Sequence, residues 1–179
     1  MADDSRPVRL EEMLLAREKR SHKCRQYLLE YGRSVIQFTM NVPGPVKASP
    51  EISLGFEAGF SSLLRHIKLH NIRVLHIETN HLITGPEGYV AVDIDAERVK
   101  RLCIQLEEGS MQGRLYDIDV HSPKGTVSRE DIGLNPRKCL LCGQNAKLCS
   151  RSRRHSAEEL MLAVHSILCG SPAANMERA

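Results

Sequence analysis

The sequence contains no tryptophan, and aromatic residues make up only 4% of its 179 positions. So few aromatic rings argue against a surface that binds single-stranded nucleic acid, because such surfaces stack bases on those rings. The net charge of +3 is also too small to indicate a polyanionic partner of that kind. We therefore expect no nucleic-acid ligand.

Long hydrophobic runs are missing as well. No apolar stretch approaches the roughly 20 residues that a membrane helix needs, and the first residues, MADDSRPVRLEEM, lack the apolar core of a signal peptide. Hydrophobic residues make up 41% of the chain and charged residues 26%, as is usual for soluble globular proteins. We expect a cytoplasmic protein with no membrane partner, built as one domain over residues 1–170 with a flexible tail over residues 171–179.

The hydrophobic pattern indicates alternating strands and helices. A first helix is expected from Leu10 to Tyr31, where apolar residues fall mostly at helical spacing. Strands are then predicted over 34–42, 72–79, 88–94 and 114–121, with helices over 50–70 and 96–108. This order matches a split βαββαβ, or ferredoxin-like, α+β sandwich with helices on one face of an antiparallel sheet. A Cys-rich segment and a final helix, which begins with the capping-box residues Ser156 and Glu159, complete the expected domain.

Two aspartates lie two positions apart in the expected strand RLYDIDVH. Side chains alternate along a strand, so Asp117 and Asp119 should project from one face and their neighbours from the other. Two carboxylates in one small space repel each other, and a divalent cation between them removes that cost. Such a pair can hold Mg²⁺ and position a triphosphate for nucleotidyl transfer. The alternative is that both aspartates only line the solvated face of an edge strand.

The residues just before this strand favour the metal-binding interpretation. Gly113 offers flexible backbone and Arg114 a cation at the strand end, so Arg114 is a candidate catalytic residue. A second D-x-D pair, Asp93 and Asp95, has a simpler explanation, since Asp95 directly precedes a helix and is well placed to cap it. We therefore place Mg²⁺ on the pair in the later strand.

The six cysteines are expected to be reduced thiols or metal ligands, because the cytosol does not favour disulfides. Cys139, Cys142, Cys149 and His155 have the spacing C-x2-C-x6-C-x5-H, which can place three thiolates and an imidazole around a tetrahedral Zn²⁺. A closed site of this kind would be structural. The competing interpretation is that these thiols pack in the core beside neighbouring leucines without a metal.

Five segments of the chain together resemble one family. They are LLAREKR at 14–20, QFTMNVPGPVK at 37–47, GPEG at 85–88, GRLYDIDV at 113–120 and RKCLLCGQNAKLCSRSRRHS at 137–156. The family is the citrate lyase holo-acyl-carrier-protein synthase family, also called apo-citrate lyase phosphoribosyl-dephospho-coenzyme A transferase. The resemblance covers nearly the whole chain in the expected order.

The resemblance implies a nucleotidyltransferase that attaches a prosthetic group to a protein. A serine hydroxyl of the citrate lyase acyl carrier protein would attack the α-phosphorus of triphosphoribosyl-dephospho-coenzyme A, which forms a phosphodiester and releases pyrophosphate. A distantly similar enzyme of malonate decarboxylase also relies on a carboxylate pair. This likeness supports Asp117 and Asp119 as the Mg²⁺ ligands.

Basic residues are the candidates for holding the anionic donor, because guanidinium and ammonium groups bind phosphate oxygens. Besides Arg114, the candidates are Lys47 on the Pro-Gly-Pro loop and the run Arg151, Arg153 and Arg154, with Gly113 as a flexible neighbour. The arginine run could instead meet an acidic carrier protein or remain a solvated surface. Arg17 and Arg20 fit the N-terminal segment of the family, but on a helix they could simply pair with acidic neighbours.

Two other interpretations stay open at this point. The same chemistry could serve another carrier protein, such as that of malonate decarboxylase, and only the identity of the partner distinguishes the two. Alternatively, the Cys cluster and the arginine run form the docking surface of a non-catalytic, zinc-stabilised binding module. The module would require Cys139 and Cys142 but tolerate Asp117→Asn, whereas the enzyme requires Asp117, Asp119 and Mg²⁺.

Overall fold

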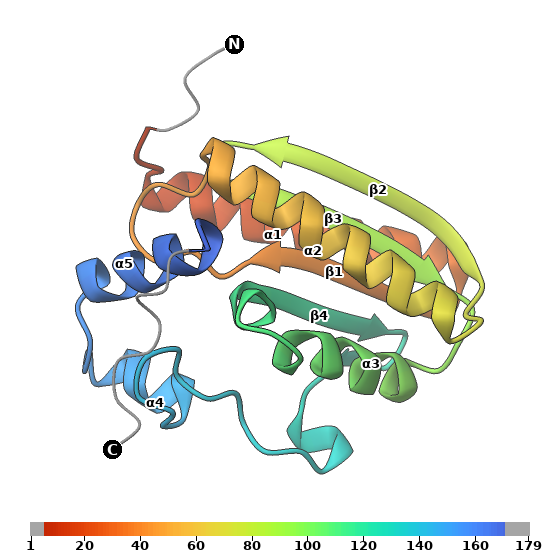
Figure 1. Cartoon of the computed structure of the whole chain (residues 1–179). Helices are drawn as coiled ribbons and strands as arrows, with labels where there is room; N and C mark the ends of the chain where they lie inside the picture. The colour runs from red at the N-terminus through yellow and green to blue at the C-terminus, as the bar shows by residue number, and fades with distance from the viewer. Residues whose placement is uncertain (1–5, 171–179) are drawn as a thin grey trace.

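A five-stranded antiparallel sheet forms the centre of the computed structural model, which describes residues 6–170 (Figure 1). The strand order is β2-β3-β1-β4-β5. The strands are β1 (Ser34–Met40), β2 (Val74–Leu82), β3 (Gly85–Val92), β4 (Tyr116–Ser122) and β5 (Gly125–Val127). The four longer strands are those that the hydrophobic pattern predicts, and β5 adds a short hairpin to the end of β4. The expected α+β class with an antiparallel sheet is confirmed.

Two helices cover one face of this sheet. The first, α2 (Pro50–Leu69), begins after Ser49, which caps it, and has proline at its first position. The second, α3 (Ala96–Glu108), begins after Asp95, whose carboxylate accepts hydrogen bonds from two backbone N–H groups at 2.9 and 3.3 Å. The prediction that Asp95 is a helix cap is confirmed.

The main hydrophobic core lies between these two helices and the sheet. All three phenylalanines of the sequence, Phe38, Phe56 and Phe60, meet here together with Tyr116. Their ring centroids lie 5.2–5.8 Å apart in stacked, tilted and edge-on pairs. Each buried ring contributes about 1.5–3 kcal/mol through the apolar surface that it removes from water. The few aromatic residues are therefore concentrated where they stabilise the fold most.

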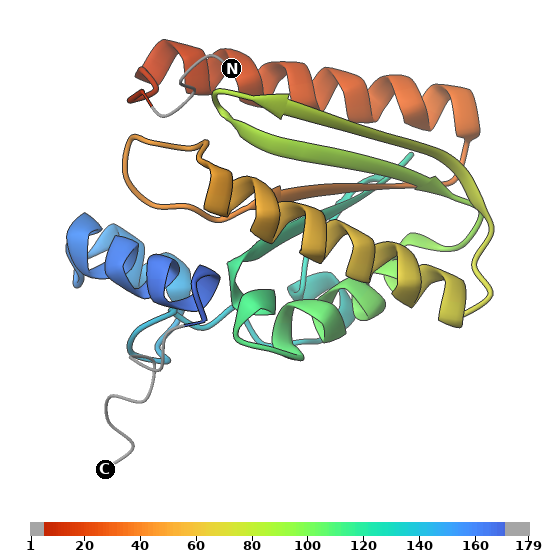
Figure 2. The same ribbon diagram turned by 45° about the horizontal axis from the view of Figure 1, so that its top comes forward.

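The opposite face of the sheet carries α1 (Leu10–Tyr31) as a separate layer (Figure 2). A second buried cluster joins this helix to the sheet, and its members are Cys24, Tyr27, Val35, Tyr89 and Ala91. The helix ends at Gly32, whose φ of 75° is a left-handed conformation that glycine adopts without strain. The prediction of helices on one face therefore describes α2 and α3 only.

The remaining segments lie outside these layers. They are η1 (Gln112–Leu115), η2 (Glu130–Ile132), α4 (Ala146–Arg151) and α5 (Ala157–Leu168). The predicted capping box of Ser156 and Glu159 is present, and Val164 and Ile167 of α5 bury Leu115 beside β4. The predicted tail over 171–179 lies outside the described residues. Within residues 6–170, no helix combines the length and apolar character that crossing a membrane requires.

Gly88 lies in β3 beneath α2, and its missing side chain lets Phe60 rest on the strand. A Cβ at this position would lie 2.5 Å from Phe60 Cε2. We expect Gly88→Ala to lower the free energy of unfolding by roughly 1–3 kcal/mol, because the ring must move within a filled core. Urea unfolding in a double-mutant cycle measures this, and Gly88→Ala should cost less beside Phe60→Leu. Equal costs in both backgrounds would contradict the steric explanation.

Candidate active site

One face of β4 carries the two aspartates of the D-x-D pair. Asp117 lies opposite Thr39 of β1, and Asp119 lies opposite Gln37, which contacts Cys24 of α1. The alternate residues of the strand are buried in the main core, and they are Tyr116, Ile118 and Val120. The predicted alternation is therefore confirmed, and both carboxylates lie on the face of the sheet that α1 covers.

A small cavity of about 160 Å³ lies beside Asp117. Its lining includes Arg17, Arg20, Thr39, Lys47, Pro86 and Asp117. These residues come from α1, from β1 and the loop after it, from β3 and from β4. Four of the five segments that carry the family resemblance therefore meet at one place, which we call the aspartate cavity.

Basic side chains from α1 and from the loop after β1 form part of the wall of the aspartate cavity. Arg20 forms an ion pair with Glu87 of β3 at 3.5 Å, and both side chains are largely buried. Lys47 Nζ donates a hydrogen bond to the Val42 carbonyl at 2.5 Å. Burial, together with the nearby charge of Arg17, lowers the pKa of Lys47. A bound phosphate would relieve this crowding of cations.

The pKa of the Asp117 carboxyl group is raised. Desolvation by the surrounding protein is the main cause, and repulsion from Asp119 adds to it, whereas the Arg137 guanidinium at 3.5 Å acts in the opposite direction. The ionised pair is thus held together at an electrostatic cost, which a divalent cation would remove. Two carboxylates are also the oxygen ligands that Mg²⁺ prefers, so the residues present fit this ion.

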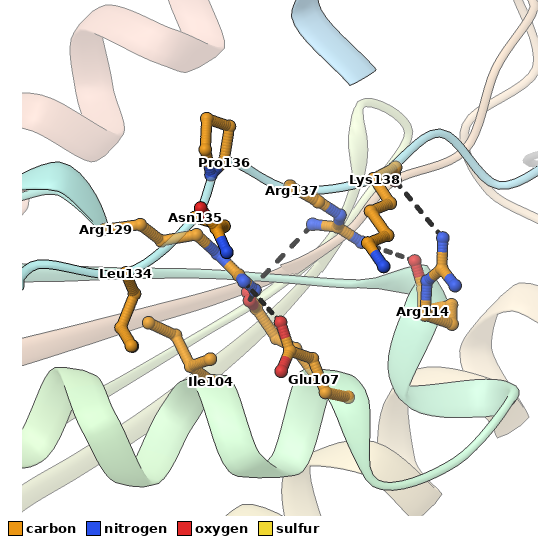
Figure 3. A pocket seen from close by; sticks show the side chains of 10 residues that line it. Ile104, Glu107, Arg114, Arg129, Leu134, Asn135, Pro136, Arg137 and Lys138 are labelled. Atoms are coloured by element: carbon orange, nitrogen blue, oxygen red, sulfur yellow. Dashed lines mark hydrogen bonds and ion pairs between the residues drawn. The ribbon is translucent and has the colours of Figure 1, made fainter. Parts of the chain in front are cut away.

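Arg114 and Gly113 have structural contacts at the start of β4. The Arg114 guanidinium donates to the backbone carbonyl of Lys138 at 3.2 Å (Figure 3) and to that of Cys139 at 3.0 Å, which ties the Cys-rich segment to the sheet. Gly113 packs closely against α3, and a Cβ there would lie 2.3 Å from the Leu106 carbonyl oxygen. Neither residue lines the aspartate cavity. Their proposed roles toward the donor stay predictions.

Charged residues that the sequence did not single out surround the outer edge of β4. Glu107 accepts a hydrogen bond from the Ile118 N–H at 3.1 Å, and Lys100 donates to the Ile118 carbonyl at 2.7 Å. Glu107 also pairs with Arg129 and Arg137 beside a cavity of about 400 Å³ (Figure 3). A glutamate on the buried stripe of a helix was the available signal, because such a residue needs a partner.

The four predicted zinc ligands come together in the structure. One ligand atom from each of Cys139, Cys142, Cys149 and His155 lies within 4.8 Å of the others. His155 Nε2 is buried without a hydrogen-bond partner among the described residues. Burial alone raises the pKa of the Cys139 thiol, but backbone N–H groups and the neighbouring thiols bond to it, and its pKa is lowered overall. This donor set is compatible with a tetrahedral zinc site.

A larger cavity of about 590 Å³ lies between the loop after β1, the Cys-rich segment and α5. Lys47 and Arg153 line this space, which we call the basic cavity. Arg151 and Arg154 are exposed and do not line it. The structure thus divides the arginine run, and the donor-binding role of each member stays a prediction.

Fold and site together define an α+β protein in which Asp117 lies beside arginine and lysine in the aspartate cavity, while Asp119 lines a neighbouring cavity that Asp117 also lines. Carboxylates and cations of this kind are the groups that metal-assisted phosphoryl transfer uses. Residues 8–170 match the family model described as apo-citrate lyase phosphoribosyl-dephospho-CoA transferase, and the chain belongs to this family. The family predicted from the five sequence segments is thereby confirmed.

Curated relatives from several bacteria agree with this assignment. The chain is 35% identical over 161 residues to "Protein CitXG" of Haemophilus influenzae, a match that covers 89% of this chain and 35% of the relative. It is 33% identical to the apo-citrate lyase phosphoribosyl-dephospho-CoA transferase of Citrobacter koseri, with 90% and 88% covered. The protein of that name from Escherichia coli O1:K1 is 31% identical, with 94% and 93% covered. The chain thus spans about a third of the Haemophilus relative and most of the other two.

Proposed function

We propose that this chain transfers the phosphoribosyl-dephospho-coenzyme A group from its triphosphate donor to a serine of the citrate lyase acyl carrier protein, releasing pyrophosphate. The family and its named relatives support transfer of this group to apo-citrate lyase. The observation in the structure that carries the proposal is the meeting of four family segments at the aspartate cavity. A site that combines a carboxylate with arginine and lysine suits the triphosphate end of the donor.

In the proposed reaction, the serine oxygen forms a bond to the α-phosphorus as the bond from that phosphorus to the bridging oxygen of the leaving pyrophosphate breaks. Pyrophosphate takes the electron pair of the broken bond, and the serine proton passes to a carboxylate or to solvent. Arg17, Arg20 and Lys47 would bind phosphate oxygens and stabilise the charge that develops on the leaving group. Glu87 positions Arg20 for this role through their ion pair.

Asp117 and Asp119 are the proposed Mg²⁺ ligands. When bound, Mg²⁺ would neutralise charge on the donor phosphates. The raised pKa of Asp117 supports this assignment, since two carboxylates that repel each other gain stability from a cation placed between them. Arg137, at 3.5 Å from Asp117, helps to hold that carboxylate in place.

A thermal-shift comparison tests the repulsion within the pair. A carboxyl group with a raised pKa binds its proton more strongly in the folded protein than in the unfolded chain, so its ionised form lowers stability. We expect Asp117→Asn to melt at a higher temperature than the wild-type chain at pH 7 without divalent ions. The difference should narrow as the pH falls toward 3.8, the ordinary pKa of aspartate, because the Asp117 carboxyl group of the wild type is then becoming neutral. Mg²⁺ should stabilise the wild type more than the variant, and a variant that melts lower at pH 7 would contradict the proposed repulsion.

The Cys cluster is the proposed site of one structural Zn²⁺. The mutual distances within 4.8 Å and the unpartnered His155 Nε2 support this, because an imidazole nitrogen buried beside thiols needs either a hydrogen bond or a metal. The ligands lie only within residues 139–155, so the ion would close a short segment of chain. Its role would be to hold that segment in shape.

The proposed fold within the α+β class is the ferredoxin-like split βαββαβ arrangement. The strand order supports it, because β3 lies between β1 and β2, and β1 lies between β3 and β4. Each helical connection therefore spans one intervening strand, as a split βαβ unit requires.

Intact mass spectrometry of the carrier tests the proposed function. The purified chain is incubated with apo citrate lyase carrier, triphosphoribosyl-dephospho-coenzyme A and Mg²⁺, and the carrier is expected to gain the mass of the prosthetic group. A parallel reaction contains the malonate decarboxylase carrier, and modification of that carrier alone would assign the same chemistry to another partner. If neither folded carrier is modified, the transferase function fails and a zinc-stabilised binding module is favoured.

A further inference from the structure

The basic cavity is the largest of the spaces described above, at about 590 Å³. Its volume lies within the range of about 300–1,000 Å³ typical of sites for small organic ligands. The loop after β1, α4 and α5 gather around it at one end of the molecule (Figure 1). Such a space is too large for a phosphate group alone.

The charge of this cavity is one-sided. Five cationic side chains line it, namely Lys47, Arg114, Arg137, Lys138 and Arg153, and none of its described lining residues is a carboxylate. Cys139, Cys149 and His155 of the proposed zinc site also lie in its wall, and a zinc ion there would offset most of the charge of its thiolate ligands. Arg137 pairs with carboxylates outside the lining, whereas the other four have no carboxylate partner within residues 6–170. The nearby Glu159 is occupied, since it accepts a hydrogen bond from the backbone of Ser156. The unbalanced positive charge therefore favours an anionic ligand.

Apolar side chains supply the rest of the lining. Val42 and Pro43 come from the loop after β1, Leu140 from the Cys-rich segment, and Leu160 and Val164 from α5. Cations and apolar surface together suit a ligand that joins phosphate groups to a larger apolar or aromatic part. A nucleoside diphosphate and its ester derivatives have this composition.

The basic cavity and the aspartate cavity share part of their walls. Asn41, Val42 and Lys47 line both, so the two spaces are neighbours along the loop after β1. The donor named for this family also has two separate anionic parts, the triphosphate that reacts and the diphosphate of dephospho-coenzyme A. One ligand with two phosphate groups matches two neighbouring cavities that both contain cations.

We infer that the basic cavity binds the diphosphate and adjoining nucleoside of the dephospho-coenzyme A part, while the triphosphate lies in the aspartate cavity. Lys138 and Arg153 contact the diphosphate, and the apolar residues contact the remainder of this part. The identity of the ligand rests on the proposed function. The inference adds a binding site away from the reacting phosphorus, so this site should bind dephospho-coenzyme A without Mg²⁺ and without the carrier.

Calorimetric titration of the full chain with dephospho-coenzyme A tests the inference. Lys138→Ala removes one cation, and Arg153→Gly removes another without backbone strain, because Arg153 has a φ of 48° that glycine adopts freely. Each variant should weaken binding by about 10-fold, the effect of losing one charge-assisted hydrogen bond. Lys124→Ala is the matched control, since Lys124 is exposed in the β4–β5 turn and should leave the dissociation constant unchanged. Thermal melting and metal content confirm that each variant is folded.

Two results would overturn the inference: dephospho-coenzyme A that does not bind to the folded wild-type chain, or binding that both cavity variants leave unchanged. Asp117→Asn should retain dephospho-coenzyme A binding, because Asp117 lies in the aspartate cavity. Loss of binding in this variant would contradict the inference that the two parts of the donor occupy separate cavities. Intact mass spectrometry of the carrier tests the proposed function independently of this binding site. If the carrier is modified but dephospho-coenzyme A does not bind, the transferase function is supported and the proposed binding site in the basic cavity is rejected. If dephospho-coenzyme A binds through the cavity residues but the carrier is not modified, the binding site is supported and the transferase function is rejected.

Discussion

Asp117→Asn and Asp119→Asn are each expected to slow transfer to the carrier by at least roughly 100-fold, because each removes one of two charged oxygen ligands from the proposed Mg²⁺ site. The side chains are nearly isosteric, so the strand should keep its pairing with β1. The measurement is the initial rate of mass gain on the carrier at saturating donor. Higher Mg²⁺ concentrations should restore part of the lost rate, since weakened metal affinity is the cause.

The second D-x-D pair provides the matched control for this experiment. Asp93 pairs with Arg33 and Arg73 on the surface, and Asp95 caps α3. Asparagine caps helices about as well as aspartate, so Asp93→Asn and Asp95→Asn should leave transfer unchanged. Equal losses at both pairs would indicate a general effect of charge. Full activity in both Asp117→Asn and Asp119→Asn would reject the proposed metal site, while the proposed transfer reaction would remain supported.

Loss of zinc from the Cys cluster is the second large effect that we expect. Cys142→Ala should reduce bound zinc from one ion per chain to nearly none and destabilise the segment over residues 137–168 by at least roughly 3 kcal/mol. The physical reason is that the ion joins four side chains of this segment, which meets the rest of the protein through bonds such as those of Arg114 and through the packing of α5 on Leu115. Metal analysis gives the stoichiometry, and limited proteolysis shows whether cleavage moves into this segment.

Cys169 is the matched control for the zinc prediction, because it is exposed and lies outside the cluster. Cys169→Ala should retain zinc and its protease resistance. A strong chelator added to the wild-type chain should reproduce the behaviour of Cys142→Ala. A wild-type chain that is folded, protease-resistant and free of zinc would instead show that the thiols pack without a metal.

Secondary structure could be predicted from the sequence because strands and helices have different periods. The helix expected over 50–70 is α2, and the strand expected over 114–121 contains most of β4. The layer formed by α1 could not be predicted. Its buried residues include Cys24 and Tyr27, but Leu14 and Leu29 are more than half exposed, so no single apolar stripe marks the face that packs. Tertiary contacts decided the orientation of this helix.

The part of the candidate site that depends on the alternation of side chains along a strand could be predicted from the sequence. The partners of long, flexible side chains could not. Alternation along a strand has only two outcomes, and it placed Asp117 and Asp119 on one face. Arg114 has a flexible side chain, and its acceptors are carbonyls 24 and 25 residues further along the chain. The pairing of Arg20 with Glu87 spans 67 residues, and no local pattern indicates it. Such pairings become visible only when the fold brings distant segments together.

The bonds that α3 makes to Ile118 determine how other molecules can approach the sheet. β5 pairs only with residues 120–122 of β4, so the earlier part of that strand would otherwise be an open edge. Glu107 and Lys100 already bond both backbone groups of Ile118. A foreign strand therefore finds no free partner there, which discourages edge-to-edge aggregation and rules out recognition by strand addition at this point. A partner protein would have to reach this part of β4 through contacts with side chains.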